Sequence, residues 1–165
     1  MTRSPSVSRR TTLKAGAGVA LSLFAGSSAF AQSPPDSPKA KQIEELVDKA
    51  AAQIDSKGKS VFPEFRETGQ WRSGDTYLFV GDMKGMSLLN AAFPKLEGTD
   101  TQNLKDSNGK LIVVEFEKVV QSKGSGWVDY MWPKPGQSQP SQKWSYAKAV
   151  KIDGEPGYVG AGFYP

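Results

Sequence analysis

The sequence predicts an α+β domain in which one long helix packs on an antiparallel sheet of about five strands. Apolar residues recur at helical spacing between residues 39 and 57. From Trp71 onward the chain carries aromatic and β-branched runs, separated by Gly-containing turns and one Pro- and Gly-rich loop. Strands joined through such connections pair antiparallel, so a helix beside an antiparallel sheet accounts for both patterns.

The predicted helix has one apolar stripe and a glycine at its end. The stripe follows the i, i+3, i+4, i+7 pattern and consists of Ile43, Leu46, Val47, Ala50, Ala51 and Ile54. Gly58 follows Lys57 directly, where a helix C-cap is expected. Packing alone explains this stripe, so the helix needs no further role.

Short segments with strand character follow the helix. The predicted strands are residues 76–80, 86–90, 127–132, 143–152 and 157–164. Residues 91–106 are predicted to be a long loop, and residues 106–109 a turn. Residues 110–123 fit two structures: Val and Ile favour a strand, whereas Leu111, Val114, Val119 and Val120 would form one face of a helix.

The net positive charge of the chain comes from its N-terminus. Arg3, Arg9, Arg10 and Lys14 lie in the first 31 residues, which contain no acidic residue. Removing these four from the 21 basic residues leaves 17, which balance the 17 acidic residues. A neutral domain lacks the positive surface that binds phosphates, so we expect no nucleic-acid partner.

Residues 1–31 resemble a twin-arginine signal peptide. The motif residues are Arg9, Arg10, Leu13 and Lys14, with Thr12 at a position where such signals usually have phenylalanine. A mild apolar stretch, residues 15–25, is too short to span a membrane, and Ala29 and Ala31 give a small-x-small cleavage site before Gln32. The alternatives are a disordered basic tail and an uncleaved anchor. Residues 32–38 then form a Pro-rich linker, and residues 39–165 the domain.

The residue types exclude most catalytic and metal chemistry. The chain has no cysteine, which excludes disulfides and thiolate metal sites, and no histidine, the usual general base. It has no Gly-x-Ser-x-Gly turn and no phosphate-binding glycine loop. Asp106, Asn108, Gly109 and Glu115 match an EF-hand loop, but Leu104 stands at its first ligand position. We therefore predict a plain turn there, no cofactor, no metal and no enzyme activity.

The order of short motifs resembles the single Cache domain of bacterial extracytoplasmic sensors, from residue 39 to the end. The motifs are residues 75–80, 82–85, 94–98, 104–110, 124–135, 143–146 and 160–164. The resemblance implies a PAS-like fold, with a long N-terminal helix beside a curved sheet that holds a small ligand, often an organic acid or amino acid. The family often has a His-Pro pair where this chain has Phe93 and Pro94, so any ligand contact by that histidine is lost.

Most candidate ligand-binding residues lie between residues 130 and 146. Strand alternation places Val128, Tyr130 and Trp132 on one face, opposite Trp127, Asp129 and Met131. Tyr and Trp offer apolar area with a polar group, and a lysine offers a cation for a carboxylate. The predicted ligand-binding residues are Tyr130, Trp132, Lys143, Tyr146 and Tyr77. The alternative is that the aromatic residues are core and Lys143 is surface.

These features predict an exported, soluble periplasmic domain that binds a small molecule and acts with a separate partner. The expected partners are a membrane sensor kinase, a chemoreceptor or a transporter. The chain stops at Pro165 without a second membrane helix or an output module, so we expect no membrane insertion after processing. The rival hypothesis is an interaction protein whose cavity its own side chains fill. An enzyme that uses carboxylates alone is the third.

The cleavage site is directly testable. N-terminal sequencing of the exported protein is expected to begin at Gln32, because signal peptidase cuts after the Ala29-x-Ala31 pattern. Any other first residue contradicts this site, and an intact residue 1 would favour the uncleaved anchor.

Overall fold

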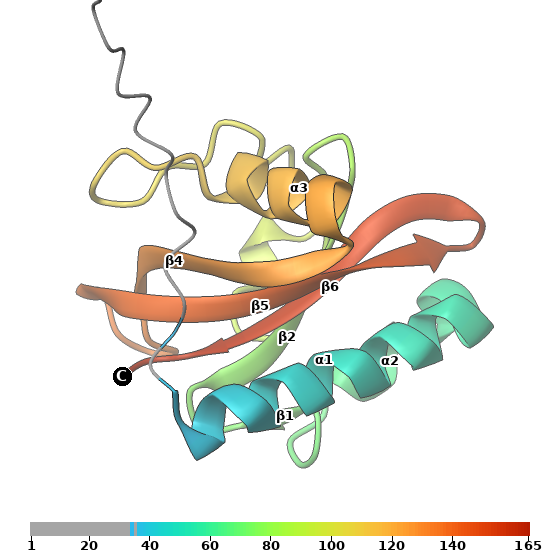
Figure 1. The fold of residues 1–165 in the computed structure, drawn as a ribbon, viewed down its shortest axis with the longest axis horizontal. Coiled ribbons are helices and arrows are strands. Elements are labelled where there is room, and N and C mark those ends of the chain that lie inside the picture. The colour runs from blue at the N-terminus through green and yellow to red at the C-terminus, as the bar shows by residue number, and fades with distance from the viewer. Residues whose placement is uncertain (1–33, 35) are drawn as a thin grey trace, which may run out of the picture.

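The computed structural model describes residue 34 and residues 36–165. The predicted signal peptide and residues 32, 33 and 35 of the predicted linker lie outside this part. The elements in chain order are α1 (Pro38–Lys57), a 3-10 turn (Gly58–Val61), α2 (Phe62–Phe65), β1 (Arg72–Ser73), β2 (Thr76–Asp82), β3 (Ser87–Asn90), a 3-10 turn (Pro94–Leu96), α3 (Ile112–Lys123), β4 (Ser125–Pro133), β5 (Pro140–Ile152) and β6 (Glu155–Phe163). One antiparallel sheet lies between α1 and α3 (Figure 1).

The helix α1 forms as its sequence predicts. Ser37 caps its N-terminus by accepting a hydrogen bond from the Ala40 backbone N–H at 3.1 Å, and Pro38 occupies the first turn. Gly58 caps the other end at φ 58°, and its N–H donates to the Ile54 carbonyl. All members of the predicted stripe are buried except Leu46, which is half-buried against the same core.

The strand order is β1-β2-β6-β5-β4, and β3 also pairs with β2. The predicted α+β class with an antiparallel sheet is therefore confirmed, with the two-residue β1 as a sixth strand. Sequence-adjacent β4, β5 and β6 pair through hairpins, whereas β2 pairs with the C-terminal β6. The middle of the sheet is thus built from the last strand of the chain.

The ambiguous segment is a helix, α3, and its apolar face explains why. Ile112, Phe116 and Val120 are buried against the sheet, and this burial outweighs the preference of Val and Ile for strands. Gly124 ends the helix in the left-handed conformation at φ 77° and donates its N–H to the Val120 carbonyl.

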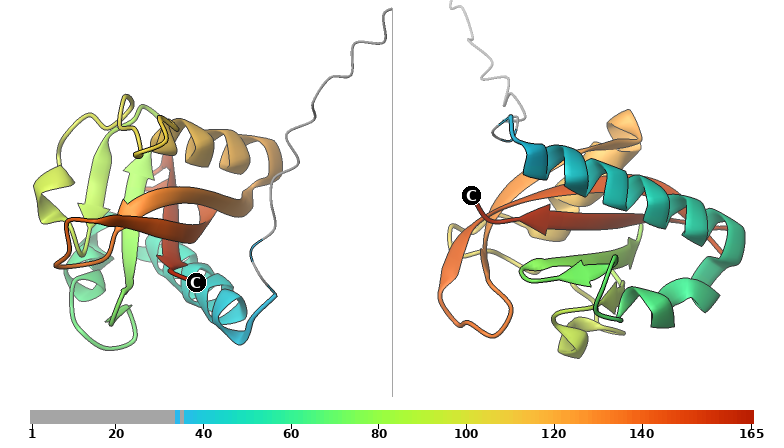
Figure 2. Two further views of the ribbon diagram at one scale, coloured as in Figure 1. Left: turned by 90° about the vertical axis from the view of Figure 1, so that its left-hand side faces the viewer. Right: turned by 90° about the horizontal axis from the view of Figure 1, so that it is seen from below.

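The two helices cover opposite faces of the sheet, as Figure 2 shows. Successive side chains along each strand therefore point alternately toward α1 and toward α3. The face toward α1 carries Leu78, Val80, Trp144, Val150, Ile152, Val159, Ala161 and Phe163. The face toward α3 carries Phe79, Val128, Tyr130, Trp132, Ala147 and Tyr158. The sequence alternation predicted for β4 is therefore present.

The turn at residues 106–109 protects the outer edge of β4. One carboxylate oxygen of Asp106 accepts the backbone N–H groups of Asn108 and Lys110, and the other accepts that of Met131 at 3.0 Å. Burial alone would raise the pKa of Asp106, but these backbone donors hold it below its usual value. With both oxygens already engaged, the plain turn is favoured over a calcium loop. No cluster of three metal-ligating side chains occurs among the described residues.

None of the helices in the described part of the chain is both long and apolar enough to cross a membrane.

The core between α1 and the sheet should dominate stability. Leu78→Ala removes a fully buried side chain, so we expect a loss of about 2–5 kcal/mol in the free energy of unfolding, measured by urea denaturation. Leu46→Ala, which truncates the half-buried leucine of α1, is the matched control and should cost less. Equal losses for both would contradict this description of the core.

Candidate functional site

A buried lysine lies on the sheet face that α3 covers. Lys143 is on β5, directly opposite Tyr130 of β4, and its side chain is 0% exposed. Its Nζ lies 3.9 Å from the ring centroid of Tyr77. The same Nζ lies between 5.5 and 5.9 Å from three further ring centroids, those of Phe79, Tyr130 and Tyr164. Aromatic rings thus surround the ammonium, and within the described part of the chain no hydrogen-bond acceptor reaches it.

Glycines on β6 make room for this arrangement. A Cβ at Gly162 would lie 2.9 Å from Cε of Lys143 and would also collide with the Trp144 carbonyl and the Ser145 hydroxyl. A Cβ at Gly160 would lie 2.5 Å from the Phe79 ring. Because β6 separates β5 from β2, Lys143 approaches Tyr77 of β2 across a strand without side chains at these two positions.

Burial makes the charged form of Lys143 costly. It lowers the pKa of Lys143 to about 7, and the charge of Asp75 opposes this only in part. The Asp75 side chain is 45% exposed, and its carboxylate already forms an ion pair with Lys134 at 3.5 Å. A buried amine without a close anionic partner is uncommon, because such groups are normally paired.

The hydroxyl groups of three tyrosines lie around Lys143. Tyr130 Oη lies 3.0 Å from Ser145 Oγ, and burial raises the pKa of Tyr130 and of Tyr77 far above the usual tyrosine value. Tyr164 donates its hydroxyl to the Pro133 carbonyl at 2.7 Å, and burial raises its pKa to about 12. All three tyrosines remain protonated near neutral pH, so Tyr77 and Tyr130 can donate hydrogen bonds, whereas the Tyr164 hydroxyl is already bound to Pro133.

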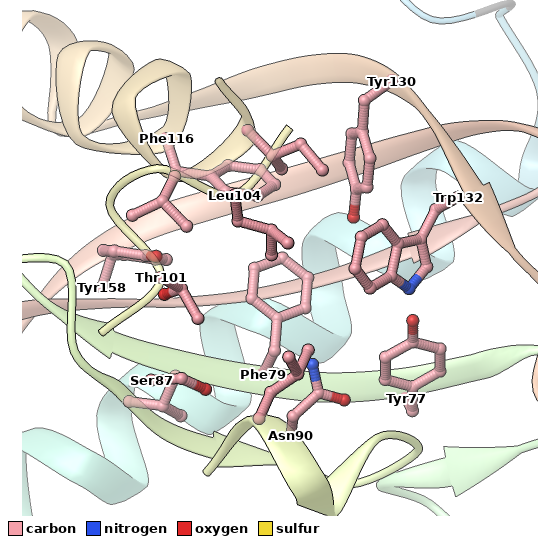
Figure 3. A pocket seen from close by; sticks show the side chains of 14 residues that line it. Tyr77, Phe79, Ser87, Asn90, Thr101, Leu104, Phe116, Tyr130, Trp132 and Tyr158 are labelled. Carbon is pink, nitrogen blue, oxygen red and sulfur yellow. The ribbon is translucent and has the colours of Figure 1, made fainter. Parts of the chain in front are cut away.

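A small cavity adjoins this cluster. Its volume is about 50 Å³, and Tyr77, Phe79 and Tyr130, three of the rings around Lys143, also line it. Figure 3 shows Tyr77, Tyr130 and Trp132 on one side of the cavity and Phe116, Thr101 and Tyr158 on the other. None of the fourteen lining residues is acidic. The space suits a ligand of a few non-hydrogen atoms.

Comparison with known proteins decides the family. The family model for the Cache domain matches residues 32–164. This chain belongs to the Cache domain family.

Individual relatives of this Cache domain are sensory proteins. The methyl-accepting chemotaxis protein McpP of Pseudomonas putida is 32% identical over 90 residues, which are 54% of this chain and 16% of that protein. The match therefore spans only a small part of the relative.

Solved structures support the same assignment. A periplasmic sensor domain of a chemotaxis protein is 31% identical with a TM-score of 0.60, covering 73% of this chain and 86% of the other. A Cache chemosensory domain, solved to explain its carboxylic acid recognition, is 28% identical with a TM-score of 0.66, covering 76% and 92%. A methyl-accepting chemotaxis protein of Vibrio parahaemolyticus, 22% identical with a TM-score of 0.65 over 76% and 88%, shares the fold. The family is thus one of sensor domains rather than of enzymes.

The structure brings together four of the five residues predicted from the sequence. Tyr77, Tyr130 and Trp132 line the cavity. Lys143 is not among the lining residues, but its Nζ lies 3.9 Å from the Tyr77 ring centroid and 5.9 Å from that of Tyr130. Tyr146 is separate: it faces α1, donates its hydroxyl to Ser125 at 2.8 Å and packs on Trp127. Lys143 and Tyr146 are three residues apart on one strand, so they point to opposite faces.

Three residues of the cluster were not predicted. Ser145 lies two residues after Lys143, and Tyr164 two residues after Gly162. Side chains two residues apart on a strand face the same side, so the sequence did contain a signal for both residues. Phe93 has no such signal, because it lies in a loop. Its ring contacts those of Tyr77 and Trp132 at centroid distances of 5.8 and 5.6 Å, so the residue at the family's His-Pro position here extends an aromatic cluster.

The buried charge should reduce stability in a pH-dependent way. The folded state holds the pKa of Lys143 at about 7, below the ordinary value of 10.5, so the penalty is complete below pH 7 and disappears as the pH rises toward 10.5. Lys143→Met keeps the volume without the charge. We therefore expect it to raise Tm at neutral pH, by an amount that shrinks at alkaline pH.

The control for this measurement is Lys148→Gln. Lys148 lies on the same strand but faces α1 and pairs with the exposed Asp48 at 2.8 Å, so its loss should change Tm little. If Lys143→Met lowered Tm at every pH, the lysine would be a stabilising core residue and the assignment of an unpaired charge would be wrong.

Proposed function

We propose that this Cache domain senses a small organic acid whose carboxylate pairs with Lys143. The observation that carries the proposal is the Nζ of Lys143, which is fully buried and lacks a hydrogen-bond acceptor in the described part of the chain. A ligand carboxylate would supply the missing acceptor and the missing counter-charge together.

The groups around the cavity favour a small carboxylate with a short hydrocarbon chain. The hydroxyls of Tyr77 and Tyr130 stay protonated and offer donors to carboxylate oxygens on the cavity side of the lysine. The remaining lining side chains are largely apolar and suit a short hydrocarbon part. Because no lining residue is acidic, the ammonium of an amino acid would be buried without a partner, so we favour an organic acid without an amine.

The relatives support the same class of ligand. One similar solved domain is a chemosensory Cache domain that recognises carboxylic acids, and the other relatives are chemotaxis proteins. A carboxylate sensor of the periplasm is therefore consistent with the family, with the predicted export signal and with a cavity of about 50 Å³.

The proposed context is the periplasm, with a separate membrane protein as the partner. The support comes from the predicted signal peptide at residues 1–31 and from relatives that are periplasmic or chemotactic sensors. Among the expected partners, the chemotaxis relatives favour a chemoreceptor over a sensor kinase or a transporter.

A thermal-shift screen tests ligand binding. Straight-chain monocarboxylates from acetate to pentanoate, added at millimolar concentration to the predicted mature chain, residues 32–165, are expected to raise Tm through mass action. Lys143→Gln should abolish the shift, whereas Lys148→Gln, on the opposite face of the same strand, should retain it.

A second pair of variants separates the site from the fold. Tyr130→Phe and Tyr146→Phe each remove one hydroxyl with one serine partner, but only the first lies on the cavity side. We expect Tyr130→Phe to weaken binding by roughly tenfold or more, as for a hydrogen bond to a charged group, and Tyr146→Phe to leave it unchanged. If no acid shifted Tm, the rival hypothesis of a self-filled cavity would replace this proposal.

A further inference from the structure

The amine of Lys143 is enclosed by groups that attract a positive charge only weakly. β2 contributes the rings of Tyr77 and Phe79, β4 that of Tyr130, and the segment after β6 that of Tyr164. β6 contributes Gly162, which has no side chain. These neighbours offer ring faces rather than carboxylates, so they replace only part of the hydration that an exposed ammonium has.

The charged side chains described around this enclosure are already paired. Asp75, in the turn before β2, pairs with Lys134, which follows β4. Lys134 itself lies over the outer part of the cluster, 5.3 Å from the Tyr164 ring centroid, and contributes a like charge. Asp129 of β4 points to the other side and binds Lys110 at 2.8 Å. The charged form of Lys143 is therefore poorly balanced while no ligand is bound.

We propose that at neutral and alkaline pH the site takes up a proton when a carboxylate binds, because the ligand's negative charge beside Lys143 favours the ammonium over the neutral amine. This inference rests on the proposed function and adds its coupling to pH. The empty domain holds a mixture of neutral amine and ammonium near neutral pH. Binding converts neutral amine, one solvent proton and one carboxylate into an ammonium–carboxylate pair, and no covalent bond forms or breaks.

The tyrosines around Lys143 do not change their protonation in this pH range. Burial keeps the phenols of Tyr77 and Tyr130 protonated in the empty site, and the pKa of Tyr164 is about 12. The empty site holds Lys143 near a pKa of about 7, so it is the group whose protonation changes between about pH 6 and pH 9. The sensor would consequently respond to a given acid more strongly in acidic surroundings.

Isothermal titration calorimetry tests the coupling in the predicted mature chain, residues 32–165. Acetate, propionate, butanoate and pentanoate are each titrated at about pH 6 and about pH 8.5, in buffers that differ in ionisation enthalpy. We expect affinity about 30-fold weaker at the higher pH, with proton uptake near zero at pH 6 and near one at pH 8.5, as follows from a pKa of about 7 that binding raises.

Asp75→Asn supplies a variant outside the enclosure. Removing this exposed carboxylate takes away a negative charge that favours the protonated lysine, so the pH at which affinity starts to fall should move downward. Lys148→Gln is the control and should leave the midpoint unchanged, because Lys148 pairs with Asp48 on the α1 face.

The outcomes separate this inference from the proposed function. Equal affinity at both pH values, with no proton uptake, overturns the coupling and leaves carboxylate binding intact. A tenfold loss of affinity per pH unit that continues below pH 6 also overturns it, because the ligand would then bind as the neutral acid. Failure of all four acids to bind at either pH overturns the proposed function, and the coupling with it.

Discussion

The absence of side chains at two positions of β6 determines how the pocket layer is built. Gly160 and Gly162 face α3, and any Cβ there would meet Phe79 or Lys143. Because these positions are empty, side chains from β2 and β5 meet above the central strand, and a long lysine side chain lies flat on the sheet. Larger residues would force the rings and the lysine apart, at the cost that overpacking brings. The cavity, the ring cluster and the buried amine therefore share one steric requirement.

The same sheet separates two kinds of interior. On the α1 side, aliphatic residues such as Leu78 and Val159 pack without polar atoms, and Glu44 of the helix binds the Trp127 indole at 2.8 Å. On the α3 side, aromatic rings enclose hydroxyls and one amine. The first layer supplies stability, which allows the second to keep a charged group that folding alone would not favour.

Local sequence patterns were enough to predict the fold class, α1 with its cap, and most strands. They left residues 110–123 undecided, because the choice between helix and strand depends on burial against β4, which no local pattern contains. In the site, too, local patterns predicted some residues and missed others. Alternation in β4 placed Tyr130 and Trp132 on one face, as in the structure, whereas Lys143 was chosen for its positive charge. Applied to β5, alternation places Lys143 and Tyr146 on opposite faces. Phe93 depends on how a loop folds over the cavity, and no periodicity encodes that.

The turn at Asp106 has a consequence for assembly. β4 is the last strand of the sheet, and such strands commonly recruit a strand from another chain through their unpaired backbone groups. Here the Asp106 carboxylate already accepts the Met131 N–H, and the Lys110 amine binds the Asp129 carbonyl. These two side chains occupy the positions that an incoming backbone would need. These two contacts therefore disfavour the addition of a further strand along this part of β4.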